Sequence, residues 1–480
     1  MLAKKIAFNV VTNSLVKILS TVLALVSLGM VTRYLGADGF GDYAVTLTFF
    51  ALFNALGDLG LANTLTREIS RENADEKHLI GRIFTLRLGI SFLVLLITPI
   101  LLFFLPYTLE VKQGIFLTSL AFVFSSAYQL LNGVFQKHLT LYKVSFIELA
   151  GKVLQVFLIG LGTMLHWGFL FIVSSLLFYM IFNFFLVLWF AHRIVPFKLD
   201  YDVHFWKKFL HESLPVGITA IITFAYFKTD TLLLSFFKTN TEVGFYNVAY
   251  KIIENLTFFP ALLIGLLLPI FSRFIFTDRE KFTITADKTF KVFLVCLLPL
   301  LLGGISLAPK IILLIAGAGF ADSIPLLRIL LLALAGIFFG NFFNAVLLAG
   351  NQQKRLMWAL GGVAISNIII NSFLIWRFSY WGAAFTTCLT ELSVALIGWY
   401  LTQKYLHYTP RWLAFWKILA ASVVMTIILW FLQNQSIFLL LPLGIGSYIF
   451  FLWLFRAIDA DEITSLFAER MTFRSKKFPL

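Results

Sequence analysis

Long apolar runs separated by short polar segments make up almost the whole chain. Runs of about 18 or more apolar residues are long enough to cross a hydrocarbon core of about 30 Å as helices. The pattern predicts fourteen such helices, at about 9–30, 43–63, 80–105, 113–135, 146–165, 168–191, 213–237, 243–271, 289–308, 323–349, 355–376, 380–402, 413–433 and 436–455. The segments between them are too short for a soluble domain. We therefore predict an all-α polytopic membrane protein.

The composition supports this fold class. The 480 residues are 60% hydrophobic and only 13% charged, whereas soluble domains average about half apolar and a quarter charged residues. Enzymes that need a sizeable soluble domain are excluded by the same pattern.

Basic residues are distributed very unevenly between the two predicted sides of the membrane. Most of the 38 lysines and arginines fall on the side of the N-terminus, in segments such as 67–87, 193–208 and 273–291. The opposite side has only Arg33, Lys112, Lys238 and Arg377. Cytoplasmic loops carry such an excess, so we expect a cell (inner) membrane protein with both termini in the cytoplasm. The net charge of +14 is then a topology signal, and no nucleic-acid partner is expected.

A few cations fall within the predicted helices or at their outer edges instead: Lys17, Lys152, Lys228, Lys251, Lys310 and Arg328. A charge at the centre of a membrane helix costs about 2.5–3.5 kcal/mol on insertion scales, so these residues need an explanation. Lys310 and Arg328 lie near the predicted outer face, where long side chains extend to the interface.

The sequence contains a weak internal repeat. The second helix begins GFGDYA, with Gly41 and Tyr43, and the eighth begins VGFYNVA, with Gly244 and Tyr246. Asn132 and Trp167 have counterparts in Asn344 and Trp381, at a similar spacing of about 210 residues. The repeat predicts two pseudo-symmetric six-helix lobes around a central cavity. The expected divisions are a lobe at 1–192, a cytoplasmic linker at 193–212, a lobe at 213–403, two further membrane helices at 404–456 and a basic cytoplasmic tail at 457–480.

Four predicted helices carry polar stripes at helical spacing. The residues that we expect to line the cavity are Asn13 and Lys17 in the first, Asp58 in the second, Tyr226, Lys228 and Asp230 in the seventh, and Asn247, Lys251 and Glu254 in the eighth. A polar stripe that faced lipid would be costly, so it should face a wet interior. Lys228 and Asp230 point about 200° apart around a helix, so each needs a partner elsewhere.

Simpler interpretations remain open for several of these residues. Lys251 and Glu254, like Glu148 and Lys152, have the spacing of ion pairs within one helix. Asp58, in ALGDLGL, has the setting of a cap at a helix break between Gly57 and Gly60. Asn367 and Asn371 are typical of hydrogen bonding between membrane helices.

Catalytic and metal-binding motifs are not found. Cys296 and Cys388 lie in apolar segments without metal spacing, and no phosphate-binding loop occurs. We expect no cofactor, no metal and no enzymatic activity.

Four segments resemble the polysaccharide or O-antigen flippases, the Wzx-type branch of the multidrug/oligosaccharidyl-lipid/polysaccharide exporter superfamily. They are VTRYLGADGFGDYAVTLTFFALFNALGDLGLANTLTREIS (31–70), DTLLLSFFKTNTEVGFYNVAYKI (230–252), LAPKIILLIAGAGFADSIPLLRILLL (307–332) and NAVLLAGNQQKR (344–355). The lipid II flippase branch has a different N-terminal pattern, and drug exporters of this superfamily usually have twelve helices.

The resemblance implies export of a lipid-linked oligosaccharide, on a polyprenyl pyrophosphate carrier, to the outer leaflet by alternating access. Lys17, Lys228 and Lys251 are expected to bind the phosphates, since lysine is a compact point charge for phosphate. Asp58, Asp230 and Glu254 would balance them or couple transport to a cation. Membrane lipids, a polysaccharide polymerase and the chain-length machinery are the expected partners. The rival hypotheses are a cation-coupled exporter of small amphiphiles and a membrane enzyme that acts on lipid-linked sugar.

Overall fold

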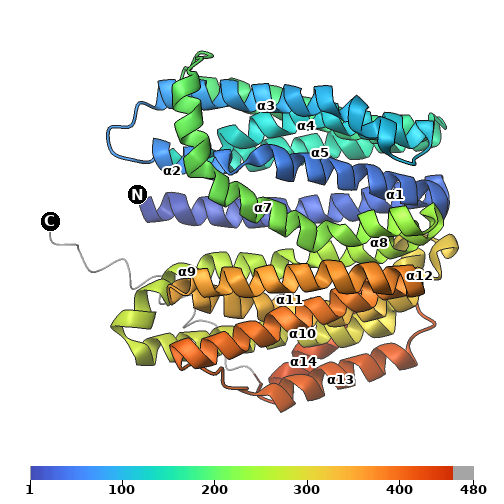
Figure 1. Cartoon of the computed structure of the whole chain (residues 1–480). Helices are drawn as coiled ribbons and strands as arrows, with labels where there is room; N and C mark the ends of the chain where they lie inside the picture. Colours follow the sequence, from blue (N-terminus) through green and yellow to red (C-terminus); the bar gives the residue numbers. More distant parts are fainter. Residues whose placement is uncertain (1, 458–480) are drawn as a thin grey trace. The chain divides into compact units, whose positions relative to one another are not determined.

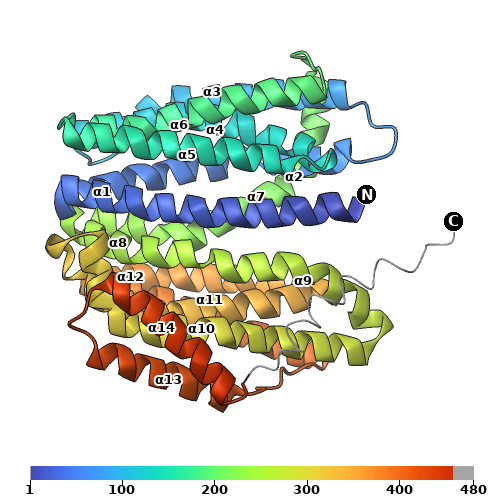
Figure 2. The same cartoon turned by 180° about the vertical axis from the view of Figure 1, so that it is seen from behind.

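The computed structural model describes the backbone of residues 2–457 and the side chains of residues 12–265 and 267–457 (Figures 1 and 2). The predicted basic tail at 457–480 lies outside the described residues, except for Ala457.

The described chain is helical throughout, as predicted. Its elements are α1 (Leu2–Asp58), α2 (Leu61–Ile69), α3 (Glu76–Phe104), α4 (Leu109–Lys137), α5 (Leu141–Met164), α6 (Gly168–Ile194), α7 (Val203–Phe237), α8 (Asn240–Leu256), α9 (Phe258–Thr277), α10 (Arg279–Ile315), the 3-10 helix η1 (Ala318–Phe320), α11 (Ser323–Ala349), α12 (Gln353–Leu406), α13 (Phe415–Phe431) and α14 (Ile437–Leu454).

Two long helices are each broken into two membrane spans. In α1 the break is at Gly36, with a φ of 68°, and in α12 it is at Ser379, with a φ of 52°. Within the described residues, 11 helices are long and apolar enough to cross a membrane, and α13 is a shorter apolar helix. With α1 and α12 counted as two spans each and α13 added as a short span, the fourteen predicted spans are confirmed.

The chain divides into two compact units. The first unit contains residues 1–248, 315–320 and 368–383, and the second contains the rest. In the first unit α4 packs against α1, α3 and α6, α5 packs against α1 and α6, and α7 packs against α1 and α2 (Figures 1 and 2). In the second unit α9 packs against α11, and α13 packs against α14. Buried phenylalanine rings, such as Phe290, Phe293 and Phe342, fill its core.

The predicted linker at 193–212 contains a non-helical stretch at 195–202 and the first turns of α7. A set of polar contacts holds the non-helical stretch to α3. Arg82 Nε donates to Asp200 Oδ2 at 2.8 Å, and the Trp206 indole donates to the carbonyl of Arg82 at 2.9 Å. The division into lobes stays a prediction.

In the second unit, the loop between α12 and α13 is also held to a helix by polar contacts. In the first unit the helix supplies the arginine and the loop supplies the aspartate, and in the second unit these positions are exchanged. Here the helix supplies the acid, Asp287 of α10, whose Oδ1 accepts from the Tyr408 hydroxyl at 2.9 Å and from the Arg411 backbone N–H at 3.0 Å. Asp287 is 4% exposed.

The glycines of the internal repeat meet in the first unit at a close crossing of α1 and α8. A Cβ on Gly41 would lie 1.8 Å from the carbonyl oxygen of Asn240, and one on Gly244 would lie 2.1 Å from that of Ala37. Beside them the Thr241 hydroxyl donates to Asp38 at 3.2 Å, between residues 203 positions apart. Gly41 and Gly244 have the same separation, so equivalent positions of the two repeats contact each other reciprocally, and only glycine fits.

Candidate functional site

A buried carboxylate lies where α7, α8 and α12 meet in the first unit. Asp230 of α7 is 3% exposed. Its Oδ2 accepts a hydrogen bond from the hydroxyl of Tyr246 on α8, and its Oδ1 accepts one from the side-chain amide of Asn371 on α12. Burying a charge in an apolar environment is expensive unless donors compensate it, and hydrogen bonds to a charged group are the stronger ones. The contacts therefore account for an acid in this helix.

A second polar contact adjoins the first. The Thr231 hydroxyl donates to Asn247 Oδ1 at 3.1 Å, and the Asn247 amide donates to the carbonyl of Val243 at 2.9 Å. We call Asp230, Thr231, Tyr246, Asn247 and Asn371 the Asp230 cluster. Two predicted site residues, Asp230 and Asn247, are brought together here.

One oxygen of the cluster has no donor. Asn371 Oδ1 is buried and accepts no hydrogen bond within the described residues. Together with the Asp230 carboxylate it provides oxygen atoms of the kind that bind a proton or a hard cation.

Asp58 is the last residue of α1, and the chain breaks between α1 and α2 directly after it. One of the two interpretations of Asp58 from the sequence was a cap at such a break. Leu59 and Gly60 have φ values of 46° and 75°. Arg87 of α3 is 3.3 Å from Asp58 through Nη2 and donates through Nη1 to the carbonyl of Gly57. The contacts satisfy the end of α1, which a broken membrane helix requires.

Helix α7 packs closely against the same break between α1 and α2. A Cβ on Gly60 would lie 2.3 Å from the carbonyl oxygen of Ser213, and one on Gly217 would lie 2.5 Å from the carbonyl carbon of Leu59. Asp58 therefore takes part in a tightly packed joint.

Arg87 is a residue whose role the sequence reasoning missed, because it was grouped with the loop cations of 67–87. Its side chain is only 1% exposed, so it is not a loop residue. Its position seven residues inside the predicted span 80–105 is the signal that identifies it as a buried charge in need of a partner.

Lys17 and Asn13 of α1 face α5. Ser145 donates to Asn13 Oδ1 at 2.6 Å, and the Lys17 ammonium interacts electrostatically with Glu148. Lys17 is exposed. Lys152 has the spacing of an ion pair with Glu148, and its ammonium group donates to Gln155 at 2.9 Å.

The other predicted site residues lie on α7 and α8. Lys228 and Tyr226 of α7 are half-buried, and the Tyr226 ring is 4.7 Å from that of Phe227. In the second unit, Lys251 and Glu254 form an ion pair within α8 at 2.7 Å, which is the simpler of the two interpretations for these residues. Tyr246 was not among the predicted site residues, although the repeat had identified it.

Comparison with known proteins decides the family. The polysaccharide biosynthesis protein family matches residues 6–275, which is more than half of the chain. This chain belongs to that family. A comparison of its sequence with curated proteins finds no match.

Solved structures share the fold at low sequence identity. A lipid II flippase MurJ in an inward closed conformation matches with a TM-score of 0.75 and 16% identity, over 93% of this chain and 98% of that chain. An inward-facing multidrug resistance transporter of the MATE family matches with a TM-score of 0.63 and 13% identity, over 83% and 98%. A transporter of the same superfamily from Pyrococcus furiosus matches with a TM-score of 0.59 and 14% identity, over 85% and 97%.

Family and fold together establish the coarse class of the protein. It is a multi-pass membrane protein of the polysaccharide biosynthesis family, and it shares its fold with solved structures of a lipid II flippase and of a multidrug resistance transporter. The predicted fold class is confirmed.

Proposed function

We propose that this chain is a flippase that moves a lipid-linked oligosaccharide from the inner to the outer leaflet by alternating access, for the synthesis of a cell-surface polysaccharide. The observation that carries the proposal is the family match over residues 6–275, which ties a transporter fold to polysaccharide biosynthesis. A polyprenyl-pyrophosphate-linked repeat unit is the substrate. Its charged headgroup cannot cross hydrocarbon without compensation, so a flippase must supply a polar path.

Lys17 and Lys228 are the cations that we assign to the pyrophosphate. Lys17 is exposed on α1, and Lys228 is half-buried two residues before Asp230 on α7. Lys251 is a weaker candidate, because a phosphate would have to displace Glu254 from its ion pair at 2.7 Å. Asn13 and Tyr226 would provide hydrogen bonds to the sugars, whereas Asn247 is buried and bonded to Thr231 and Val243.

Asp230 is the residue that we assign to energy coupling. It is buried, accepts hydrogen bonds from Tyr246 and Asn371, and lies beside a buried amide oxygen without a donor. Binding of a proton or a monovalent cation there would neutralise the carboxylate and change the contacts among α7, α8 and α12. Asp58, by contrast, is proposed to hold the joint between α1 and α2 with Arg87.

Both chain termini are placed in the cytoplasm in this proposal, on the asymmetry of the basic residues. A polysaccharide polymerase and the machinery that sets chain length would receive the product on the other side.

Translocation in proteoliposomes tests the proposal. A fluorescent lipid-linked oligosaccharide is incorporated, and its movement between leaflets is followed for the wild type, Lys17→Ala, Lys228→Ala and the exposed control Lys354→Ala. We expect translocation by the wild type and the control, and at least about tenfold slower movement in each of the other two, as for loss of a charge-assisted contact of about 1.5–3 kcal/mol. Wild-type rates in folded Lys17→Ala and Lys228→Ala would refute the site assignment but not the flippase activity.

A cation-coupled exporter of small amphiphiles is the second candidate, and the burial of Asp230 favours it. This candidate predicts transport of small amphiphiles that depends on an imposed sodium or proton gradient. A wild-type protein that carried them and left lipid-linked oligosaccharide in its original leaflet would replace the first proposal with the second.

A further inference from the structure

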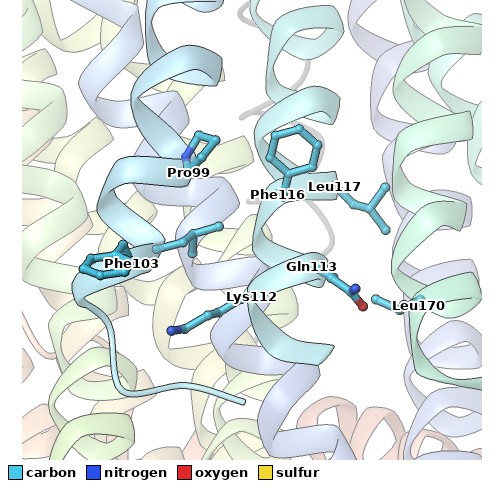
Figure 3. A pocket seen from close by; sticks show the side chains of 8 residues that line it. Pro99, Phe103, Lys112, Gln113, Phe116, Leu117 and Leu170 are labelled. Carbon is cyan, nitrogen blue, oxygen red and sulfur yellow. The ribbon is translucent and has the colours of Figure 1, made fainter. Parts of the chain in front are cut away.

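A groove with a volume of about 590 Å³ opens on the first unit where α3, α4 and α6 meet. Figure 3 shows its lining side chains: Pro99 and Phe103 from α3, Phe116 from α4 and Leu170 from α6 form apolar walls, and Lys112 and Gln113 from α4 are the polar residues. In this view Lys112 extends toward Phe103, and Gln113 points toward Leu170. The groove is thus apolar along most of its length and polar at one end.

The groove lies on a surface that faces lipid. Large apolar side chains of α3 next to it are strongly exposed, including Leu96 at 71%, Phe103 at 80% and Phe104 at 76%. Such a surface is stable in a membrane because hydrocarbon chains cover it. Lys112 lies in the first turn of α4, directly after the short connection at 105–108, which is where a membrane helix meets the headgroup layer.

Lys112 is the basic residue of this groove. Within the part of the chain that the structure describes, its ammonium group has no ion-pair or hydrogen-bond partner. The side chain is half-buried, so it lies against the groove and does not extend fully into water. A cation in this setting attracts an anionic group from the lipid phase.

At the corresponding place in the second unit, the cation is bonded to the protein backbone. Pro309 of α10 has no N–H to donate to the carbonyl of Ile305, and Arg328 of α11 donates to that carbonyl through Nε at 3.3 Å. The first unit has the matching proline, Pro99 of α3, and the matching cation, Lys112 of α4. Within the described residues Lys112 makes no such contact, and a groove lies beside Pro99, so the ammonium group is available to a ligand.

We propose that this groove binds an anionic phospholipid, with the phosphate at Lys112 and an acyl chain along Phe103, Phe116 and Leu170. The lysine supplies the charge that a phosphate needs. The apolar walls give the acyl chain a defined place, which an isolated interfacial lysine does not provide. This inference does not depend on which substrate the protein transports.

Native mass spectrometry of the full-length protein in detergent provides the test. The fraction carrying one lipid is measured with phosphatidylglycerol or with phosphatidylcholine, for the wild type and Lys112→Gln. We expect about fivefold weaker binding of phosphatidylglycerol in Lys112→Gln, the effect of one lysine near an anionic surface, and little change for phosphatidylcholine. Lys238→Gln, which removes another lysine on the same predicted side but outside the groove, should bind as the wild type does.

A second variant tests the apolar part of the groove. Leu170→Trp fills it without changing the charge, and binding of both lipids at this position should fall. Equal phosphatidylglycerol binding in the wild type and Lys112→Gln would overturn the proposal, as would equal binding of the two lipids by the wild type. Displacement of phosphatidylglycerol by an equal concentration of polyprenyl phosphate would also overturn it, because the groove would then serve the carrier lipid.

Discussion

The two repeats of the chain carry different residues at the position of the buried acid. At the separation of 203 residues that relates Asp38 to Thr241, Tyr246 corresponds to Tyr43 and Asp230 corresponds to Ser27. In the second repeat the tyrosine donates to the carboxylate. In the first repeat Tyr43 packs against Phe40, and the Ser27 hydroxyl donates to the carbonyl of Leu23 at 3.0 Å within its own helix. The tyrosine is kept and the charge is not.

Two other features, the glycine crossing and the loop contacts, have the same structural role in both repeats. The glycines at the crossing of α1 and α8 are the same in both repeats, because any side chain would collide with a backbone carbonyl. The loops after α6 and α12 are both held to a neighbouring helix, with acid and base exchanged between Arg82–Asp200 and Asp287–Arg411. The glycines that hold the fold thus recur in both repeats, and each loop keeps a polar contact with a helix, whereas Asp230 corresponds to a serine. This difference is why we assign function to Asp230.

The largest effect is expected at the glycine crossing. Gly41→Leu or Gly244→Leu forces a side chain into a carbonyl oxygen 1.8 or 2.1 Å from the new Cβ. Overpacking typically costs about 1–3 kcal/mol, occasionally more, so we expect a large loss of folded protein and of thermal stability. Gly89→Leu is the matched control, since no atom lies within 4 Å of a Cβ there. Equal thermal stability of the three variants would show that the repeats do not meet closely at this crossing.

The next effect concerns the buried acid that holds the second loop. Asp287→Ala leaves the Tyr408 hydroxyl and the Arg411 N–H without their acceptor. Tyr408 is buried, and a buried group without its partner costs about 1–3 kcal/mol. Asp200→Ala removes a more exposed acid and should destabilise less. Thermal unfolding in one detergent compares them, and a larger loss in Asp200→Ala would reverse the comparison.

A smaller, pH-dependent effect is expected at Asp200. Hydrogen bonds from Arg82 and His78 lower the pKa of its carboxyl group below the ordinary value. The stability gained from a lowered pKa is present above the unfolded value, near about 3.9, and is lost as the pH falls through the folded value. Asp200→Asn should therefore be less stable than the wild type at pH 6, and the difference should shrink as the pH is lowered below the unfolded value of about 3.9. A difference independent of pH would exclude this electrostatic contribution.

The smallest effects are expected in the first repeat at the positions that match the acid and its tyrosine. Ser27→Ala removes a hydroxyl bonded within its own helix, and Tyr43→Phe removes a hydroxyl from a ring packed on Phe40. Both should translocate substrate within about twofold of the wild-type rate, since such losses are worth about 0.5–1.5 kcal/mol or less. A strong defect in Ser27→Ala would indicate that both repeats contribute to transport.

The sequence predicted the fold better than the site, for physical reasons. Apolar length alone determines where a membrane helix can lie, so the spans and the helical class could be read directly, and glycines marked the repeat. Partners across helices depend on rotation and packing, which one sequence does not reveal. The pairing of Asp58 with Arg87 was missed for this reason, as were the contacts of Asp230 with Tyr246 and Asn371.

The lysines also show that partners on other helices cannot be predicted from the sequence. Intrahelical spacing was enough to suggest the pair of Lys251 with Glu254. Lys17 of α1 interacts electrostatically with Glu148 of α5, and no spacing along the chain indicates this interaction. Sequence reasoning therefore found the charged positions but could not distinguish those that are paired.

Translocation of a lipid-linked oligosaccharide by Asp230→Asn tests the central claim most directly. The substitution keeps the size of the side chain and removes its charge, and thermal unfolding verifies that the variant is folded. We predict translocation at least about tenfold slower than in the wild type, the loss that corresponds to about 1.4 kcal/mol, with Ser27→Ala unaffected. Translocation by folded Asp230→Asn at the wild-type rate would contradict the assignment of energy coupling to the Asp230 carboxylate of the second repeat.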